Sequence, residues 1–384
     1  MNLNIFFNSL EVGVAEPGAD LHSFRHYIDL NYEEFPAWPQ AQIALIGLHE
    51  GRGNPKNHGA ELAADEIRKE LYRLKKGSGS CKIVDLGNLR PAETLAQTNL
   101  RLKEVCQILI EKGILPVVIG GTHDLCLGMW QAYEEIGKPV VLTNIDSAFD
   151  LEEGVNLNPS ATFLSNLFVT KDSYLSGYNH IGYQSYLVSE ESLEYSQSRQ
   201  FNCIRLGELR EDIREVEPYV READMVMFDF TAIKSSDAPG SFESRPFGLS
   251  GEEACQLAWY AGCSPHLSSF GLFEYNPLQD EDHRGAKVAA CIIWYVIEGF
   301  KAGQRPMRFD GDKTVRYLVP IDGFPHHFVF YKNQLTNTWW MALDGETGRP
   351  IPCSHSDYLQ ACHGEIPSRW IKSESIRRTR LSLP

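Results

Sequence analysis

Short apolar segments alternate with longer amphipathic segments from about residue 41 to about residue 300. The short segments, such as AQIALIGL at 41–48 and ILPVVIGG at 114–121, are apolar at nearly every position. Successive side chains of a strand point to opposite sides, so a strand of this composition must be buried on both faces. The longer segments, such as 63–76 and 99–113, have the spacing of helices. The alternation predicts a parallel sheet with helices on both faces.

We therefore expect a single large α/β domain with three α/β/α layers over residues 41–302, after an N-terminal extension at 1–40. Beyond residue 302 the segments TVRYLVPI, HHFVFYKN and TWWMALD are typical of antiparallel strands joined by turns. Residues 303–384 are expected to form a β-rich appendage packed on the main domain. Trp339 and Trp340 are candidates for that packing contact, or alternatively for an exposed interface with a partner.

Composition argues against several classes of protein. The formal net charge of −15 disfavours nucleic acid or an anionic membrane as a partner, because both attract clustered Lys and Arg. Nine scattered cysteines in a long chain favour free thiols in a reducing compartment. The first residues lack a basic segment followed by a long apolar run, and no window has the ~18 apolar residues of a membrane span. We expect a cytoplasmic protein.

Polar side chains follow four of the predicted strands directly. They are His123 in GGTHDL, Asp146 and Asp150 in DSAFD, Asp229 in MFDFT, and Glu274 in LFEYNP. The carboxyl ends of parallel strands share one edge of a sheet, so these side chains can meet there. One histidine with three aspartates suits a divalent cation such as Mn²⁺. Taken singly, each of these residues can also be a helix cap, a turn former or a hydrogen-bonded loop residue.

The order GGTHDL, IDSAFDL, FDFTAIKSSDAPGS, LFEYNP resembles the ureohydrolase family, which includes arginase, agmatinase and formimidoylglutamase. The resemblance covers about residues 40–300, and the length and C-terminal tail are most similar to bacterial formimidoylglutamases. It implies a parallel-sheet α/β fold, assembly into trimers or hexamers, and a guanidino or amidino ligand. It also implies two Mn²⁺ ions that activate a hydroxide for attack on the guanidinium or formimino carbon.

Transferred residue by residue, the resemblance implies one complete metal site. His123 and Asp150 match the residues that bind only the first metal in the family. Asp146 and Asp229 match the two aspartates that bridge both metals. Asp150 and Glu274 are the candidate catalytic residues, and Glu274 matches the carboxylate that faces the cationic group of the substrate.

The second metal loses the two ligands that belong to it alone. They fall at Ala148 and Thr231, neither of which offers the family's histidine or aspartate side chain. The resemblance therefore implies at most one Mn²⁺ per chain. Three aspartates and one dication sum to −1, and Lys234 is a candidate to offset that charge, or else a solvated loop lysine. The loop at 158–163 offers no histidine to shuttle protons.

Three functions from different classes remain open. The first is an active formimidoylglutamase-type hydrolase of C–N bonds. The second, which we prefer, is a weak or inactive relative that binds a guanidino or amidino compound. The third is a non-catalytic scaffold that contacts its partners through the appendage. The cysteines and histidines at 353, 355, 362 and 363 are a further candidate for zinc, although their spacing matches no usual zinc pattern.

Overall fold

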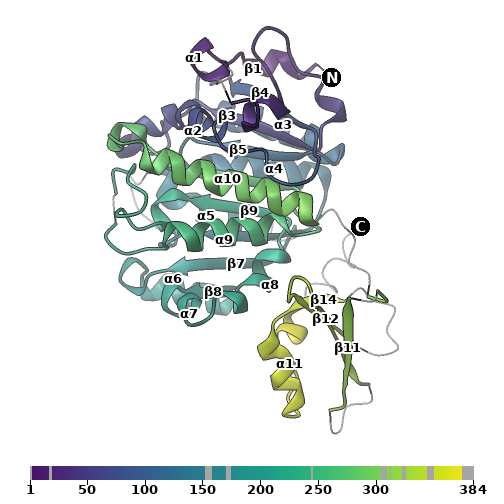
Figure 1. Cartoon of the computed structure of the whole chain (residues 1–384). Coiled ribbons are helices and arrows are strands. Elements are labelled where there is room, and N and C mark those ends of the chain that lie inside the picture. Colours follow the sequence, from purple (N-terminus) through teal and green to yellow (C-terminus); the bar gives the residue numbers. More distant parts are fainter. Residues whose placement is uncertain are drawn as a thin grey trace.

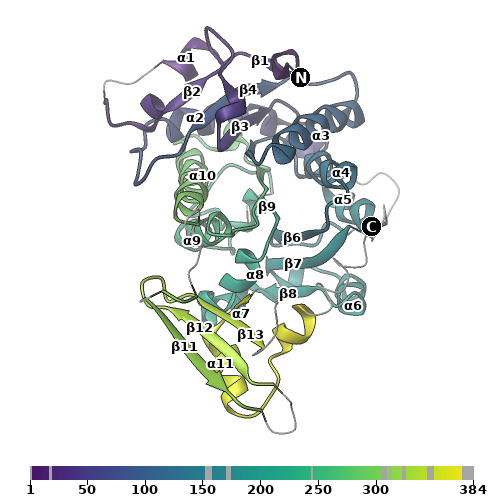
Figure 2. The same cartoon turned by 90° about the vertical axis from the view of Figure 1, so that its right-hand side faces the viewer.

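The computed structural model describes residues 2–16, 20–151, 158–169, 174–243, 245–303, 309–311, 313–321, 326–343 and 350–373. A mostly parallel sheet forms the centre of the chain, with helices on both faces (Figure 1). A small antiparallel sheet of C-terminal strands lies at one end of the molecule (Figure 2). The predicted fold class, a three-layer α/β/α domain with a β-rich appendage, is confirmed.

The main sheet has ten strands in the order β1-β4-β3-β5-β10-β9-β6-β7-β8, with β2 also paired to β4. Only the pair of β1 with β4 is antiparallel among the strand pairs described in this sheet. The strands are β1 (Phe7–Asn8), β2 (Ile28–Leu30), β3 (Ile43–Leu48), β4 (Ile83–Leu89), β5 (Leu115–Ile119), β6 (Val140–Ile145), β7 (Leu175–Tyr183), β8 (Asn202–Arg205), β9 (Met225–Asp229) and β10 (Ser269–Phe273).

Side chains of each central strand enter two separate cores. In β3, Ile43 and Leu45 belong to the core beneath α2, α9 and α10, whereas Ala44 and Ile46 belong to the core beneath α3, α4 and α5. This alternation explains why the strands are apolar at nearly every position. The helices are α1 (Val12–Ala15), α2 (Ala63–Leu71), α3 (Leu95–Glu111), α4 (Cys126–Ile136), α5 (Pro159–Val169), α6 (Glu190–Ser198), α7 (Leu206–Glu211), α8 (Glu217–Arg221), α9 (Gly251–Gly262) and α10 (Arg284–Gly303).

Two short N-terminal strands share one edge of the main sheet. Strand β2 pairs with residues 83–85 of β4, and β1 pairs with residues 88–89 of the same strand. Between these two pairings, Asn31 Nδ2 donates a hydrogen bond of 2.8 Å to the carbonyl of Leu86. The N-terminal segment is therefore part of the main sheet, and the division of the chain at residue 40 stays a prediction.

The C-terminal appendage is a four-stranded antiparallel sheet backed by a helix. It contains β11 (Thr314–Val319), β12 (Phe328–Asn333), β13 (Trp339–Leu343), β14 (Ile351–Cys353) and α11 (His355–Cys362). Arg221 of α8 donates to the carbonyl of Trp339 at 2.8 Å, and its guanidinium lies 4.3 Å from the Trp340 ring centroid. The Trp340 ring therefore contacts the main domain, whereas the Trp339 ring stacks on Tyr317 and Tyr358 within the appendage. None of the described helices is long and apolar enough to cross a bilayer.

Candidate metal centre

Four predicted ligands meet where three strands end. His123 follows β5 after a turn through residues 120–121, Asp146 comes directly after β6, and Asp229 is the last residue of β9. Asp150 lies on the loop that continues from Asp146. The strands β5, β10, β9 and β6 are consecutive in the sheet, so their carboxyl ends lie along one edge. The turn before His123 requires glycine, because both of its residues have positive φ, +83° and +74°.

The ligand atoms of the four side chains all lie within 4.8 Å of one another. His123 Nδ1 is 3.1 Å from Asp229 Oδ2, 3.3 Å from Asp150 Oδ2 and 3.7 Å from Asp146 Oδ2. The three carboxylates therefore converge on one nitrogen, as the sequence predicted. Their role as metal ligands remains a prediction.

Burial makes this cluster unfavourable without a cation. His123 Nδ1, Asp146 Oδ2 and Asp150 Oδ2 are buried and have no well-directed hydrogen bond. Burial and the neighbouring charges of Asp229 and Asp150 raise the pKa of Asp146 well above its usual value. Burial opposes charge on His123, but contacts with Asp150 and Asp229 outweigh it and raise the pKa of the imidazole. One nitrogen and three carboxylate oxygens, buried and unpaired, fit a divalent ion such as Mn²⁺.

The two positions at which the resemblance places the ligands of a second metal, Ala148 and Thr231, lie beside the cluster. The backbone N–H of Ala148 donates to Asp146 Oδ1 at 3.1 Å, and that of Thr231 donates to Asp229 Oδ1 at 2.6 Å. The carboxylate oxygens that do not face His123 are therefore held by the main chain. Within the described ranges, the cluster of His123 and the three aspartates is the sole grouping of three or more metal-ligating side chains.

Glu274 lies next to the cluster and is firmly held. It follows β10 in a left-handed backbone conformation, with φ of +65°. The backbone N–H of His123 donates to Glu274 Oε1 at 2.9 Å. Asn57 and Asn54 donate to Oε2 at 2.8 Å and 3.2 Å. Burial and the charge of Asp229 raise the pKa of Glu274 to about 7. Sequence reasoning missed both asparagines, although the segment GRGNPKNHG that contains them is rich in polar and glycine residues.

The segment 158–163 is not a loop as predicted, because α5 begins at Pro159. Proline suits the first helical position, where its missing N–H has no partner to lose. The helix forms a wall of the site. The Phe163 ring centroid lies 4.5 Å from that of His123, and Ser160 Oγ donates to Asp124 Oδ1 at 3.0 Å. No histidine of this segment reaches the cluster, since the segment contains none.

Lys234 does not offset the charge of the cluster. Its Nζ lies 3.2 Å from Asp237 Oδ1, and its side chain is about one-third exposed. The proposal for Lys234 that followed from its closeness in sequence to Thr231 is therefore wrong. The lysine sits on a turn, where an i,i+3 carboxylate is a nearer partner.

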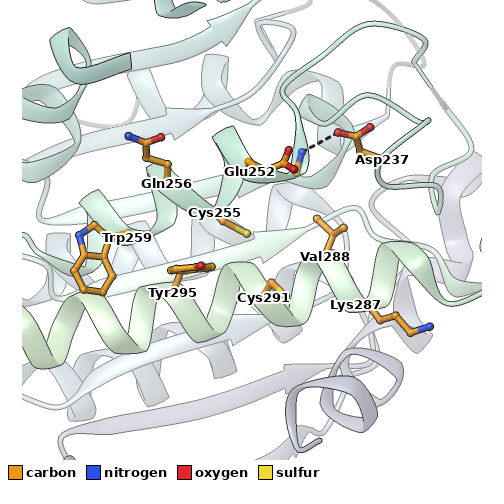
Figure 3. A pocket seen from close by; sticks show the side chains of 10 residues that line it. Asp237, Glu252, Cys255, Gln256, Trp259, Lys287, Val288, Cys291 and Tyr295 are labelled. Carbon is orange, nitrogen blue, oxygen red and sulfur yellow. Dashed lines mark hydrogen bonds between the residues drawn. The ribbon is translucent and has the colours of Figure 1, made fainter. Parts of the chain in front are cut away.

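A well-defined surface groove lies away from this centre. A surface groove of about 600 Å³ lies between α9 and α10, lined by Cys255, Trp259, Cys291 and Tyr295 among others (Figure 3). No member of the metal cluster lines it. The candidate zinc residues of the appendage do not gather either: Cys353 is buried while Cys362 is exposed, and among the described residues they form no ligand cluster.

The sequence of this chain is similar to a known protein family and to several of its characterised members. Residues 41–298 match the arginase family. A formimidoylglutamase of Geobacillus thermodenitrificans is 26% identical over 296 residues, covering 73% of this chain and 91% of that relative. One from Staphylococcus carnosus is 24% identical over 299 residues, covering 73% of this chain and 95% of the relative.

Solved structures agree with the sequence matches. A variant of Trypanosoma cruzi formiminoglutamase solved with Mn²⁺ has a TM-score of 0.64 and 25% identity, covering 71% of this chain and 97% of that one. The formimidoylglutamase of Bacillus subtilis has a TM-score of 0.66 at 18% identity, covering 76% of this chain and 96% of its own, which supports the fold.

Proposed function

Because this chain belongs to the arginase family and resembles its formimidoylglutamases, we propose that it binds one Mn²⁺ and a guanidino or amidino compound, with weak or no hydrolysis. The ion is held by His123, Asp146, Asp150 and Asp229. The observation that carries the proposal is this single four-ligand cluster, flanked by Ala148 and Thr231. A similar solved structure that contains Mn²⁺ supports the choice of metal.

The ligand is proposed to lie beside Glu274. An amidinium or guanidinium group carries N–H donors in one plane, which match a fixed carboxylate. Three N–H groups from Asn54, Asn57 and the His123 main chain fix the orientation of Glu274. A cationic ligand favours the ionised form of a carboxyl whose pKa burial has raised to about 7.

Chemistry at the site depends on how many ions it holds. A bound Mn²⁺ supplies Lewis-acid polarisation, and two ions together lower the pKa of water further than one does. Asp146 and Asp229 each give one oxygen to the cluster, and backbone N–H groups occupy the other. With Ala148 and Thr231 where the family has a histidine and an aspartate, a second ion would have only the shared Asp146 and Asp229 as ligands, which is why we propose weak or absent hydrolysis.

A second candidate is an active formimidoylglutamase-type hydrolase. It is favoured by the similarity to formimidoylglutamases over 73% of the chain and by the complete set of first-metal ligands. Retention of these buried acids also argues against a pure scaffold, for which clustered carboxylates only cost stability. A cytoplasmic location and a homo-oligomer remain proposals that follow from composition and from the family.

The deciding experiment combines metal content with a ligand screen. Purified protein is loaded with Mn²⁺, dialysed and measured for manganese per chain. Arginine, agmatine and N-formimino-glutamate are then tested for binding by calorimetry and for release of urea, formamide or ammonia. One ion per chain with binding and negligible turnover supports the proposal. Two ions per chain, or rapid turnover of any of the three compounds, would refute it.

A further inference from the structure

A buried histidine of the central sheet contacts the metal-binding loop at two points. His180 lies in β7, and its side chain is fully buried. Its Nε2 atom lies 3.2 Å from the backbone carbonyl oxygen of Asp146. The Phe149 ring meets the imidazole edge-on, with the two ring centroids 4.2 Å apart. One imidazole therefore contacts both the first ligand of the loop, Asp146, and the residue directly before the second ligand, Asp150.

The hydrogen bonds of His180 fix which ring nitrogen carries the proton. A carbonyl oxygen only accepts, so Nε2 carries the N–H that donates to Asp146. On the other side of the ring, the Tyr178 hydroxyl lies 2.9 Å from Nδ1. Burial lowers the pKa of His180 to about 3, so the ring is neutral and Nδ1 accepts the hydrogen of Tyr178. Tyr178 thereby holds the imidazole in the tautomer that donates to Asp146.

Strand β7 holds the loop at neighbouring points as well. The backbone N–H of Asp146 donates to the Ile181 carbonyl at 3.0 Å, so the strand contacts both main-chain polar groups of this ligand. Further along the loop, Phe149 lies against Tyr183 as well as His180, with a centroid distance of 5.3 Å to Tyr183. The path of the loop between its two aspartates is therefore defined by residues of β7.

Packing alone does not require a histidine at this position. A buried imidazole costs free energy unless its polar atoms have partners, whereas an apolar ring would fill the space without that cost. Both nitrogen atoms of His180 have partners, and one partner is the main chain of a predicted metal ligand. Removal of a hydrogen bond that orients a metal ligand typically weakens metal affinity by about 10–100-fold.

We propose that His180 is a positioning residue of the metal centre. It sets the path of the main chain between Asp146 and Asp150, and therefore the separation of their carboxylates, although it is not a member of the ligand cluster itself. Tyr178 acts with it by fixing the imidazole. The inference rests on the proposed metal site, and it explains why two polar side chains lie inside a buried strand.

The test compares Mn²⁺ binding among variants of β7. His180→Phe keeps a ring against Phe149 and removes the donor to Asp146, so we expect the Kd for Mn²⁺ to rise about 10–100-fold. His180→Gln keeps an N–H donor, and its Kd should stay within about threefold of wild type. The electron paramagnetic resonance spectrum of bound Mn²⁺ reports the arrangement of its ligands. It should change in His180→Phe and match wild type in His180→Gln.

Asn179→Leu is the matched control. Asn179 is the adjacent buried residue of the same strand, and its side chain donates on the opposite face of the sheet, to Thr143 Oγ1 and to the Tyr219 carbonyl. This variant should lower the melting temperature and leave the Kd within about twofold of wild type. A Kd of His180→Phe within about twofold of wild type would overturn the inference, and so would an equal loss of affinity in Asn179→Leu.

A second variant covers the case in which His180→Phe does not fold. Tyr178→Phe removes only the hydroxyl that fixes Nδ1, and it should raise the Kd about threefold or more. An unchanged Kd in this variant would also defeat the inference. Two ions per chain or rapid turnover in wild type refutes the proposed function, whereas the inference is decided by the ratio of Kd values for the first ion.

Discussion

Binding of Mn²⁺ should release protons. The ligand atoms lie within 4.8 Å, so two ionised carboxylates repel by about 3 kcal/mol or more at an effective dielectric constant of ~20. Protons relieve this repulsion in the metal-free protein, because the pKa values of His123 and Asp146 are both raised well above their usual values. A metal ion requires a neutral imidazole and ionised carboxylates, so it displaces the protons that these groups hold.

The pH dependence follows from the sign of each shift. The raised pKa of His123 stabilises the metal-free fold at low pH, and that contribution is lost as pH rises through the folded pKa. The raised pKa of Asp146 means that ionising this carboxyl destabilises the metal-free fold as pH increases. The metal-loaded protein carries neither proton. The thermal shift produced by Mn²⁺ should therefore grow from pH 6 to pH 8, reaching about 5 °C when Mn²⁺ is near 100 times its Kd.

Calorimetric titration in two buffers of different ionisation enthalpy counts the released protons. The apparent association constant should rise by up to about 100-fold per pH unit while both groups are protonated, tenfold for each proton. Asp146→Asn is the informative variant, because it should release fewer protons than wild type and bind Mn²⁺ more weakly. Release of no proton by wild type at pH 7 would show that the cluster is already ionised, and the electrostatic reasoning would be wrong.

Three further outcomes are expected. Ala148→His with Thr231→Asp should increase bound manganese by more than the sum of the single variants, measured by equilibrium dialysis, because each ligand alone must hold the ion with two shared aspartates. Turnover of arginine, agmatine or N-formimino-glutamate should fall several orders of magnitude below the common range of ~1–10³ per second, and a rate within that range contradicts the proposed function. Asn57→Ala should weaken ligand binding about tenfold or more, since it removes a hydrogen bond to the Glu274 carboxylate, and calorimetry should show unchanged Mn²⁺ content.

Convergence of the four ligands could be predicted because it depends on topology. His123 and Asp146 follow apolar strands and Asp229 ends one, and parallel strands bring such positions to one edge regardless of their distance in sequence. The strand β7 (Leu175–Tyr183) was missed because its interior contains polar residues. In the structure these polar side chains have hydrogen-bond partners. Asn179 donates to Thr143 of the neighbouring strand β6 at 3.0 Å, and Tyr178 and His180 share a hydrogen bond of 2.9 Å.

The supporting residues could not be predicted from local sequence. Asn57 reaches Glu274 across 217 positions of the chain, a contact that no local pattern in the sequence indicates. Lys234 was a candidate charge partner because it is close in sequence to Thr231, yet it forms its ion pair with Asp237. Charge partners are selected by side-chain direction and loop packing, which become visible only once the fold is known.

The two short strands that share β4 have a consequence for association. A parallel sheet that ended at β4 would present a row of unpaired N–H and C=O groups, which is a template for pairing with another chain. Strands β2 and β1 occupy the two ends of that row, and Asn31 covers the interval between them. Strands β1 and β2 thus prevent a further strand from pairing with β4 at this edge of the sheet. Copies of this chain that assemble must therefore meet through helices or loops at this flank, and a truncation that begins after Asn31 should promote concentration-dependent aggregation.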